Sequence, residues 1–266
     1  MLPVTTTIAL AGKGGVGKTT VAALLIKFLI QMRSGSILAI DADPSSNLNM
    51  LLGVNLDWTV GDIREEMLGE VKRSLQTQGA AIGTLPHGML KRDYLDYEIR
   101  SSVAEADRFD LIAMGRSEGP GCYCAVNHHL REVVDAISSS YRYVVIDNEA
   151  GMEHLSRRTT RDVQLLLVVS DVSLRGIIAA GRIAAFRHAF DINIENAYLI
   201  LNGLRGDTIP DPLLDQIGQL DIPLLGTLPH DDRLFQLDID GRPVISIEDS
   251  SPVYRSAVHL LGQLLC

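Results

Sequence analysis

The stretch GKGGVGKTT at residues 12–20 is the feature that most constrains the fold of this chain. It follows an apolar run, TTIALAG at 6–12, and it precedes TTVAALLIKFLIQMR, a segment typical of a buried helix. It fits the pattern G-x-x-x-x-G-K-[ST], which cradles phosphate when it joins a strand to a helix. The sequence therefore predicts a phosphate-binding strand–loop–helix unit near the N-terminus.

Each residue type in this loop has a physical task. Glycines let the backbone fold round an anion with its N–H groups pointing inward, and the helix N-terminus adds a favourable dipole. We expect Lys18 to bridge the β and γ phosphates of a nucleotide, Thr19 to place its hydroxyl on Mg²⁺, and Thr20 to reach the α phosphate. The loop residues expected to bind nucleotide are Gly14, Gly15, Val16, Gly17, Lys18, Thr19 and Thr20.

Continuous apolar runs alternate with helical patterns along the rest of the chain. Continuous runs are typical of strands covered on both faces, and strand–helix alternation favours a parallel sheet. The further strands are expected at 36–43, 109–115, 141–148, 163–170, 197–203 and 223–229, with helices at 123–140, 173–190 and 252–265. No linker interrupts the pattern. The sequence predicts an α/β fold, a single P-loop NTPase domain over residues 1–266 with a mostly parallel central sheet and helices on both faces. The segment 57–108 is the least regular and is expected to pack helices beside the sheet.

Composition excludes several classes of protein. A net charge of −9 and a pI of about 5.2 oppose a nucleic-acid-binding surface, which needs clustered cations. The one basic cluster, at 157–161, is interpreted as a solvated face. The longest apolar stretch, VAALLIKFLIQM, contains Lys27 and is too short to cross a membrane. Three cysteines imply no disulfide framework, and the first residues carry no leader pattern, so a cytoplasmic protein without a membrane partner is expected.

A second lysine, Lys13, stands early in the loop. With it, KGGVGKTT resembles the deviant Walker A motif of the MinD/ParA/nitrogenase-iron-protein class of ATPases. In that class the early lysine reaches across a dimer interface to the partner's nucleotide, where a cation stabilises charge on the transferring phosphoryl group. The resemblance implies ATP hydrolysis to ADP, catalytic roles for Lys13 and Lys18, and a homodimer.

Two aspartates that end apolar runs match further motifs of that class. In IDADPSSNL, Asp43 matches the switch I aspartate, which would orient the attacking water and contact Mg²⁺ through water. In VVIDNEAG, Asp147 looks like a Walker B carboxylate that holds a Mg²⁺-bound water, and Gly151 matches the switch II glycine whose N–H senses the γ phosphate. Open sheets bind ligands at the carboxyl ends of their strands. We therefore expect both aspartates at one catalytic site and not merely as helix caps.

The residues that contact the base are harder to assign. Asn202 ends the run LILNGL, where the class places an asparagine that contacts adenine, and the loop LPHDD matches the other side of that pocket. The resemblance thus implies base contacts from Asn202, Pro229, His230 and Asp231. No N-K-x-D guanine signature is present, so ATP is favoured over GTP.

Two of the three cysteines, Cys122 and Cys124, lie one residue apart in GPGCYC. A disulfide between residues i and i+2 would close a strained ring, and two thiolates are too few for a tetrahedral metal site. His128 and His129 could complete the shell, or a twofold dimer could bring two pairs together. Four sulfurs would suit Zn²⁺ or, in a square-planar arrangement, Ni²⁺. Two unrelated cysteines remain the alternative.

GPGCYC together with VIDNEAGMEHLSRR resembles the CooC-type nickel-insertion ATPases, which mature carbon monoxide dehydrogenase. The resemblance spans nearly the whole chain. It implies that Cys122 and Cys124 bind nickel or zinc across the dimer interface. It also implies a client, apo carbon monoxide dehydrogenase or the related acetyl-CoA synthase. Glu149, Glu153 and His154 match the family segment without an assigned role.

Two other functions within the class stay open. A reductase like the nitrogenase iron protein would place an iron–sulfur cluster between subunits, but in that family the cysteines lie far apart in sequence. A positioning switch like MinD or ParA would need a basic amphipathic membrane helix or a basic DNA surface. The segment SPVYRSAVHLLGQLLC has one arginine and no basic face.

Overall fold

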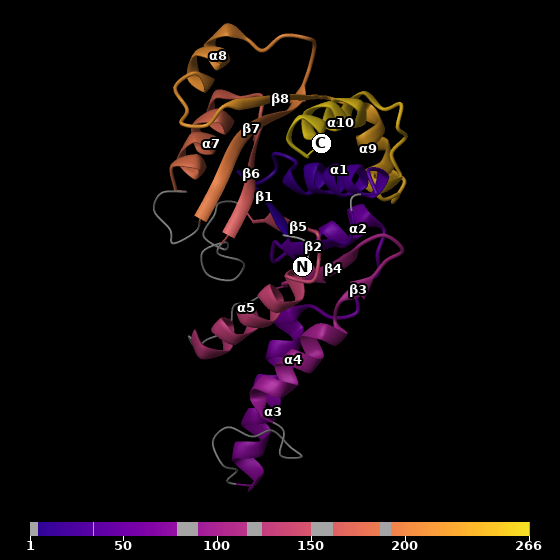
Figure 1. Ribbon diagram of the computed structural model, residues 1–266, viewed down its shortest axis with the longest axis vertical. Coiled ribbons are helices and arrows are strands. Elements are labelled where there is room, and N and C mark those ends of the chain that lie inside the picture. The colour runs from indigo at the N-terminus through magenta and orange to yellow at the C-terminus, as the bar shows by residue number, and fades with distance from the viewer. Residues whose placement is uncertain are drawn as a thin grey trace.

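The computed structural model describes residues 5–33, 35–78, 90–115, 124–149, 162–186 and 193–265 of the 266-residue chain. The strands in this part form one eight-stranded sheet with the order β3-β4-β2-β5-β1-β6-β7-β8 (Figure 1). Their bounds are β1 Thr6–Gly12, β2 Ile37–Ala42, β3 Ala104–Glu105, β4 Asp110–Ala113, β5 Tyr143–Asn148, β6 Asp162–Asp171, β7 Asn193–Leu204 and β8 Leu224–Pro229. Each predicted strand is present within a few residues of its expected bounds.

All ladders in this sheet are parallel except the short one between β3 and β4. The strand β1 lies in the middle and pairs with β5 on one side and β6 on the other. Its core positions are buried on both faces, which is why the run is apolar throughout and does not alternate. The predicted α/β fold with a mostly parallel sheet is confirmed.

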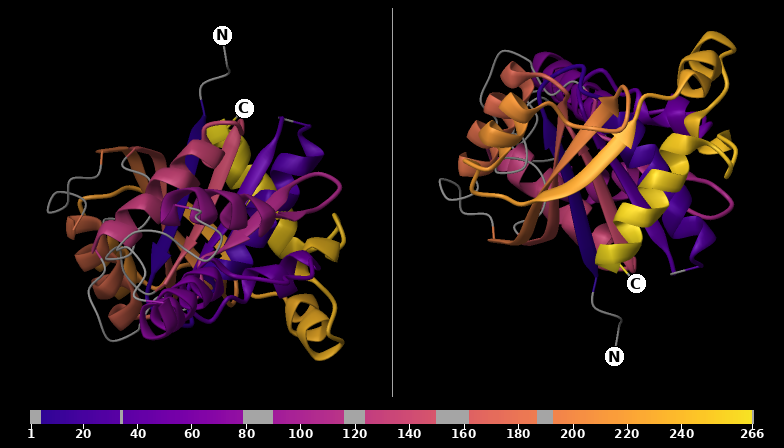
Figure 2. Two further views of the ribbon diagram at one scale, coloured as in Figure 1. Left: turned by 90° about the horizontal axis from the view of Figure 1, so that it is seen from below. Right: turned by 90° about the horizontal axis from the view of Figure 1, so that it is seen from above.

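Two hydrophobic clusters lie on the two faces of the sheet. Helices cover both faces (Figure 2). Along β1, Ile8 and Leu10 face one layer, while Ala9 and Ala11 face the other. The first layer contains α1 Lys18–Gln31, α2 Leu48–Leu52, α9 Asp232–Ile239, the 3₁₀ turn η2 Val244–Ser246 and α10 Pro252–Leu265. The second contains α3 Val60–Gln78, α4 Lys91–Ser101, α5 Cys124–Ser138, α7 Leu174–Phe186 and α8 Asp211–Ile217.

The segment 57–108, expected to be irregular, holds the long helix α3 and the helix α4, which pack on one another and extend past the sheet (Figure 1). Their inner turns bury Val60, Ile63 and Met67 of α3 and Leu95 and Ile99 of α4. Helices beside the sheet were predicted here. The antiparallel edge strand β3 was not, because two residues carry no periodicity.

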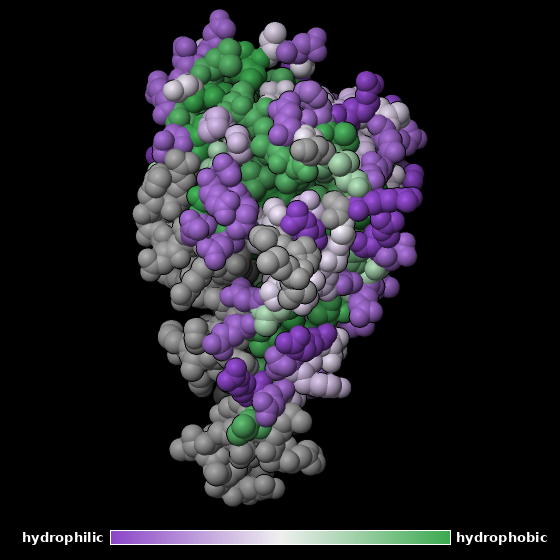
Figure 3. All heavy atoms as spheres, in the orientation of Figure 1, coloured by the Kyte–Doolittle hydropathy of each residue, from purple (hydrophilic) through white to green (hydrophobic). Residues whose placement is uncertain are grey.

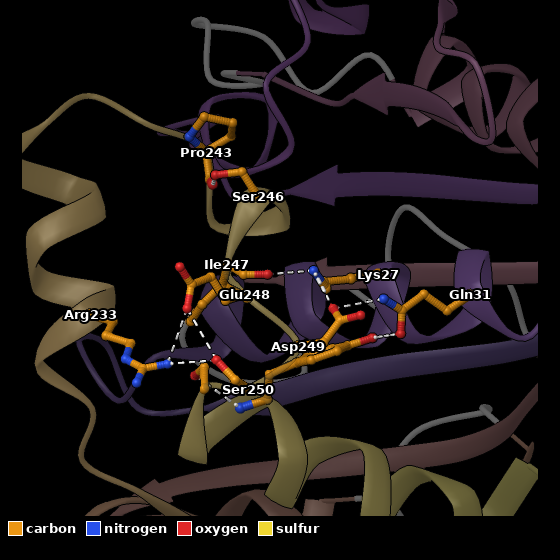
Figure 4. A network of polar contacts seen from close by, with 11 residues as sticks. Lys27, Gln31, Arg233, Pro243, Ser246, Ile247, Glu248, Asp249 and Ser250 are labelled. Carbon is orange, nitrogen blue, oxygen red and sulfur yellow. Dashed lines mark hydrogen bonds and ion pairs between the residues drawn. The ribbon is translucent and has the colours of Figure 1, made fainter.

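Polar contacts tie α1 to the segment before α10 (Figure 4). Lys27 Nζ donates to the carbonyl oxygen of Ile247 and lies 3.0 Å from Asp249 Oδ1. The same ammonium lies 4.7 Å from the centre of the Tyr254 ring. Gln31 Nε2 donates to Asp249 Oδ1 at 2.9 Å, and the Tyr254 hydroxyl donates to Gln31 Oε1 at 2.6 Å. These contacts hold α10 and the segment before it against α1.

The surface in the view of Figure 1 is uneven in polarity. Figure 3 shows apolar residues gathered on the half of the molecule that carries β7, β8 and α8, with hydrophilic residues around them. Among the described residues, no helix combines the length and the apolar character that a bilayer crossing requires.

Candidate nucleotide site

The phosphate loop connects the carboxyl end of β1 to α1. At two of its positions, neighbouring atoms leave no room for a side chain, so glycine is required there. A Cβ atom on Gly12 would lie 2.2 Å from the carbonyl oxygen of Val169 on β6. A Cβ on Gly17, where φ is 91°, would lie 2.3 Å from Asn202 Nδ2. Only glycine fits such close approaches, and Gly17 also adopts a left-handed conformation that side chains disfavour. The loop is therefore packed between the neighbouring strands β6 and β7.

The two loop lysines differ in their surroundings. Lys18, the first residue of α1, is 7% exposed, and its Nζ donates to the carbonyl oxygen of Lys13 at 3.3 Å. Lys13 itself is exposed on the loop. A buried ammonium at a helix N-terminus is held where an anion would compensate it. The catalytic roles of Lys13 and Lys18, including the reach of Lys13 into a partner, stay predictions.

Asp147 is the penultimate residue of β5 and lies beside the start of α1. It is 1% exposed, and its Oδ1 has no hydrogen-bond partner among the described residues. Burial raises the pKa of Asp147 to about 7, and the charge of Asp41 adds to the rise. A hydrogen bond from Thr19 and the charge of Lys18 act in the opposite direction. The strand end thus brings Asp147, Thr19 and Lys18 together, and their roles toward Mg²⁺ and phosphate stay predictions.

Asp41 is a site residue that was not predicted from the sequence. It is fully buried on β2, and its Cα is the ladder partner of Asp147 on β5. Its Oδ1 accepts from the backbone N–H of Asp43 at 3.1 Å, and its Oδ2 accepts from that of Leu48 at 2.9 Å. Burial raises the pKa of Asp41 to about 6. The signal was present in IDAD, where two aspartates alternate at a strand end.

Asp43 lies two residues further along the chain and is partly exposed. Its Oδ1 accepts from the backbone N–H of Ser45 at 2.9 Å and from the Ser45 hydroxyl at 2.6 Å. These bonds orient the carboxylate at the carboxyl edge of the sheet, next to Asp41. The role of Asp43 in orienting water stays a prediction.

The oxygen atoms at this edge fit a magnesium ion. Mg²⁺ prefers hard oxygen ligands and is usually held by one or two carboxylates, water and the phosphates of the substrate. The unpartnered Oδ1 of Asp147 is such a ligand, and the hydroxyl of Thr19 lies against the same carboxylate. Within the described ranges, no three His, Cys, Asp or Glu side chains form a protein-only metal cluster. The donor set therefore suits an ion that arrives with a nucleotide.

A cavity of 570 Å³ lies on the other side of the phosphate loop. It is lined by Gly15, Val16, Gly17, Asp171, Val172, Ser173, Asn202, Gly203, Leu204, Arg205, Thr208 and Pro210. Asn202 Nδ2 donates to the carbonyl oxygen of Val16 at 2.9 Å, so the predicted base-contacting residue also touches the loop. Asp171 and Arg205 were missed, although each follows an apolar strand whose end was recognised. The cavity has the size and mixed lining that suit a nucleoside.

The LPHDD loop lies beside this cavity and does not line it in the described structure. The backbone N–H of His230 donates to the carbonyl oxygen of Leu204 at 2.8 Å, and His230 Nε2 lies 3.3 Å from Arg205. Asp231 caps α9 by accepting from the N–H of Arg233 at 3.0 Å, and it accepts from the Ser251 hydroxyl at 2.6 Å. The structure thus gives Asp231 partners within the fold. Base contacts by Pro229, His230 and Asp231 stay predictions.

Several predicted site residues fall in the parts of the chain that the structure leaves undescribed. Gly151, Cys122, Glu153 and His154 lie outside the described residues. Cys124 begins α5, but its side chain is not described. The switch II glycine and the cysteine pair therefore remain predictions from sequence.

Comparisons with known proteins agree with this geometry. The family model described as "CobQ/CobB/MinD/ParA nucleotide binding domain" matches residues 7–244. An uncharacterized ATP-binding protein of Methanocaldococcus jannaschii is 39% identical, over 97% of this chain and 98% of its own length. The carbon monoxide dehydrogenase accessory protein CooC of Rhodospirillum rubrum is 32% identical, over 96% of this chain and 94% of its own length.

Solved structures show the same fold. The septum site-determining protein MinD of Pyrococcus horikoshii, complexed with Mg-ADP, superposes with a TM-score of 0.68 and 19% identity, covering 98% of this chain and 96% of that one. A ParA family ATPase of Chlorobium tepidum gives a TM-score of 0.67 and 20% identity, with 97% and 98% covered. The family match covers most of the chain, and the phosphate loop and the aspartates at the sheet edge agree with it. This chain therefore belongs to the CobQ/CobB/MinD/ParA family of nucleotide-binding domains.

Proposed function

We propose that this protein hydrolyses ATP and uses the cycle to insert nickel into carbon monoxide dehydrogenase. The observation that carries the proposal is its 32% identity to a carbon monoxide dehydrogenase accessory protein, which extends over nearly the full length of both chains. The pair Cys122 and Cys124 supplies the thiolates that such a cargo would need. A relative at 39% identity is an ATP-binding protein, which supports the nucleotide half alone.

The chain's own residues divide the work of ATP hydrolysis. Lys18 would hold the β and γ phosphates, and Asp43 would orient the attacking water. Lys13, exposed on the loop, would supply a cation to the nucleotide of a second copy. Thr19 and Asp147 would hold Mg²⁺, which neutralises charge on the phosphates when bound. The lining of the 570 Å³ cavity would hold the nucleoside.

The metal half of the proposal depends on a homodimer. Each chain offers two closely spaced thiols, and tetrahedral or square-planar sulfur coordination needs four. A twofold axis would supply the other two, and the same axis would bring each Lys13 to the partner's nucleotide. Nucleotide and metal would then favour the same dimer, so each would raise the affinity for the other. The nickel ion is cargo for an apo-enzyme, carbon monoxide dehydrogenase or acetyl-CoA synthase.

The main competing function is a positioning switch of the MinD kind, in which a terminal helix binds membrane. In this chain α10 buries Val253, Tyr254, Ala257, Leu260 and Leu261 against the core, where it packs on β8 and α1. An apolar face that is used in the core is not free to enter a lipid surface. This face of α10 is therefore not itself a membrane-binding surface, and vesicle binding by the full chain distinguishes the two functions.

Equilibrium dialysis of the full chain with Ni²⁺ tests the proposal, with and without a non-hydrolysable ATP analogue, together with light scattering for mass. We expect about one Ni²⁺ for each two chains by ligand count, and tighter binding with the analogue. The double variant Cys122→Ala/Cys124→Ala should lose the ion and the metal-dependent dimer. Cys266→Ala removes the third thiol and serves as the matched control, with no expected change.

Other outcomes would contradict the proposal. Equal Ni²⁺ binding by the native chain and the double variant would remove the role of the cysteine pair. Sedimentation with anionic vesicles in the presence of ATP would favour the positioning switch. A brown, sulfide-containing protein after anaerobic purification would favour an iron–sulfur reductase.

A further inference from the structure

Asn202 makes a hydrogen bond to the protein backbone that a contact with the adenine base would not require. It lies near the carboxyl end of β7, and its Nδ2 donates to the carbonyl oxygen of Val16, 186 positions earlier in the chain, at 2.9 Å. The orientation of the amide is settled by chemistry, because a carbonyl oxygen only accepts and the amide nitrogen only donates. The bond joins the wall of the 570 Å³ cavity to the loop that would hold phosphate.

The peptide group between Val16 and Gly17 is held from two sides. Val16 is 4% exposed and packs in the core layer that contains α1. On the other side, Asn202 Nδ2 leaves no room for a side chain on Gly17, since a Cβ there would lie only 2.3 Å away. Gly17 has φ 91° and ψ 26°, and its carbonyl oxygen accepts the N–H of Val21 at 3.0 Å. Gly17, which shares the held peptide group through its N–H, is thus the N-cap residue of α1, and its carbonyl in the next peptide group accepts the first hydrogen bond of the helix.

We propose that Asn202 is a positioning residue for the phosphate loop, and that it strengthens triphosphate binding even when no base is present. Without the bond, the Val16 carbonyl loses its donor and the peptide group gains freedom to rotate. The loop N–H groups then lose part of their preorganisation toward an anion. The proposal rests on the nucleotide-binding half of the proposed function and is independent of the metal half.

A ligand without base or ribose separates this role from a base contact. Binding of Mg²⁺-tripolyphosphate and of Mg²⁺-ATP to the full chain is measured by calorimetry, for the native protein, Asn202→Ala and Asn202→Leu. Leucine keeps the approximate volume and removes the donor. One hydrogen bond is worth about a fivefold to tenfold change in a binding constant. We expect a loss of that size for tripolyphosphate in both variants, and at least as large a loss for ATP.

Asn196→Ala is the matched control. Asn196 lies on the same strand, and its Nδ2 donates to the carbonyl oxygen of Gln164 on β6, at 3.5 Å, on the exposed amino-terminal side of the sheet. It should bind both ligands within twofold of the native protein. Thermal unfolding of all variants shows whether any loss follows from destabilisation.

A second measurement reports the peptide group directly. The amide ¹⁵N resonance of Gly17 responds to the hydrogen bond that the preceding Val16 carbonyl accepts. In the ligand-free protein it should shift in Asn202→Leu and stay in place in Asn196→Ala. This readout decides the matter where native tripolyphosphate binding is too weak to quantify, and a general loss of stability would not move it selectively.

The outcomes distinguish the two proposals. An unchanged tripolyphosphate affinity in the Asn202 variants, with weaker ATP binding, would make Asn202 a base contact alone and overturn the positioning role. An unchanged Gly17 resonance would do the same. Failure of the native chain to bind Mg²⁺-ATP would instead overturn the proposed function.

Discussion

The helix α1 carries one buried lysine, Lys18, and one partly buried lysine, Lys27, and the surroundings of the two ammonium groups differ. At its first residue, Lys18 is 7% exposed, and among the described residues its ammonium donates one long hydrogen bond, to Lys13. Further along the helix, the Lys27 side chain is 12% exposed, and its ammonium contacts a carbonyl and a carboxylate (Figure 4). The ring of Tyr254 also lies beside this ammonium. A buried cation is costly unless it is compensated. Lys27 is compensated by the fold, whereas Lys18 has one carbonyl and the nearby charge of Asp147 as its described partners, and we predict that phosphate completes them.

The carboxylates near the two ends of α1 also differ in their surroundings. At the phosphate end, Asp41 and Asp147 are buried side by side, and burial raises the pKa of each. At the far end, Asp249 is exposed, and hydrogen bonds from Gln31 and Lys27 lower its pKa. Buried carboxylates with raised pKa values mark the candidate site, whereas the exposed and hydrogen-bonded Asp249 belongs to the scaffold.

The largest expected effect is that of Lys18→Met. Removal of the buried cation at the loop should lower the affinity for Mg²⁺-ATP, or its turnover, by about 100-fold or more. Stability should change little, because the loss of the Lys18 interactions with the Lys13 carbonyl and the Asp147 carboxylate is offset by the removal of a buried charge. Calorimetric titration and urea unfolding measure the two quantities. A Lys18→Met variant that loses stability but binds Mg²⁺-ATP as tightly as the native protein would show that Lys18 stabilises the fold and does not bind the nucleotide.

Asp41→Asn tests the buried carboxylates through pH. The pKa of Asp41 is about 6 in the folded chain, above its ordinary value of 3.8, so the folded state binds this proton more tightly than the unfolded state. Its stabilising contribution is complete below about pH 4 and is lost as pH rises through 6, a change of about 3 kcal/mol. Urea unfolding of nucleotide-free protein in EDTA, from pH 4 to 8, should show a shallower decline for the variant. If the unfolding free energy declined with pH equally in the variant and the native protein, burial of Asp41 would not be the cause of the decline.

Lys27→Met should act on stability alone. It leaves the Ile247 carbonyl without its donor and removes the contact with Asp249, at a cost of about 2 kcal/mol in unfolding free energy. Affinity for Mg²⁺-ATP should stay within twofold of native, because α1 still begins at the same loop. A large loss of nucleotide binding would show that the two ends of the helix are coupled.

The smallest expected effect is that of Asp249→Asn. Its carboxylate is 69% exposed, and exposed ion pairs contribute less than about 1 kcal/mol. Chemical unfolding at low and high salt measures it, with a difference from native that shrinks at high salt. A loss as large as that of Lys27→Met would mean that the ion pair, and not the Ile247 carbonyl, secures the lysine.

Much of the fold could be predicted because the signals are local. Strands covered on both faces are continuously apolar, and the phosphate loop has a fixed pattern between a strand and a helix. For the same reason Lys18 and Thr19 could be proposed as site residues from the loop pattern, and Asp147 from its place at a strand end together with the family resemblance. The short strand β3, the helices α8 and α9 and the cap at Asp231 were missed, since their few residues carry too little periodicity.

By itself, the sequence determined where the strands lie, that β1 leads into an anion-binding turn, and which acidic residues end strands. Tertiary structure alone decided the neighbours: Asp41 opposite Asp147, Asn202 on the Val16 carbonyl, and Lys27 under the segment before α10. Strand order and register depend on how both faces of the sheet pack. Contacts between residues that are far apart in the chain therefore have no local sequence pattern that predicts them.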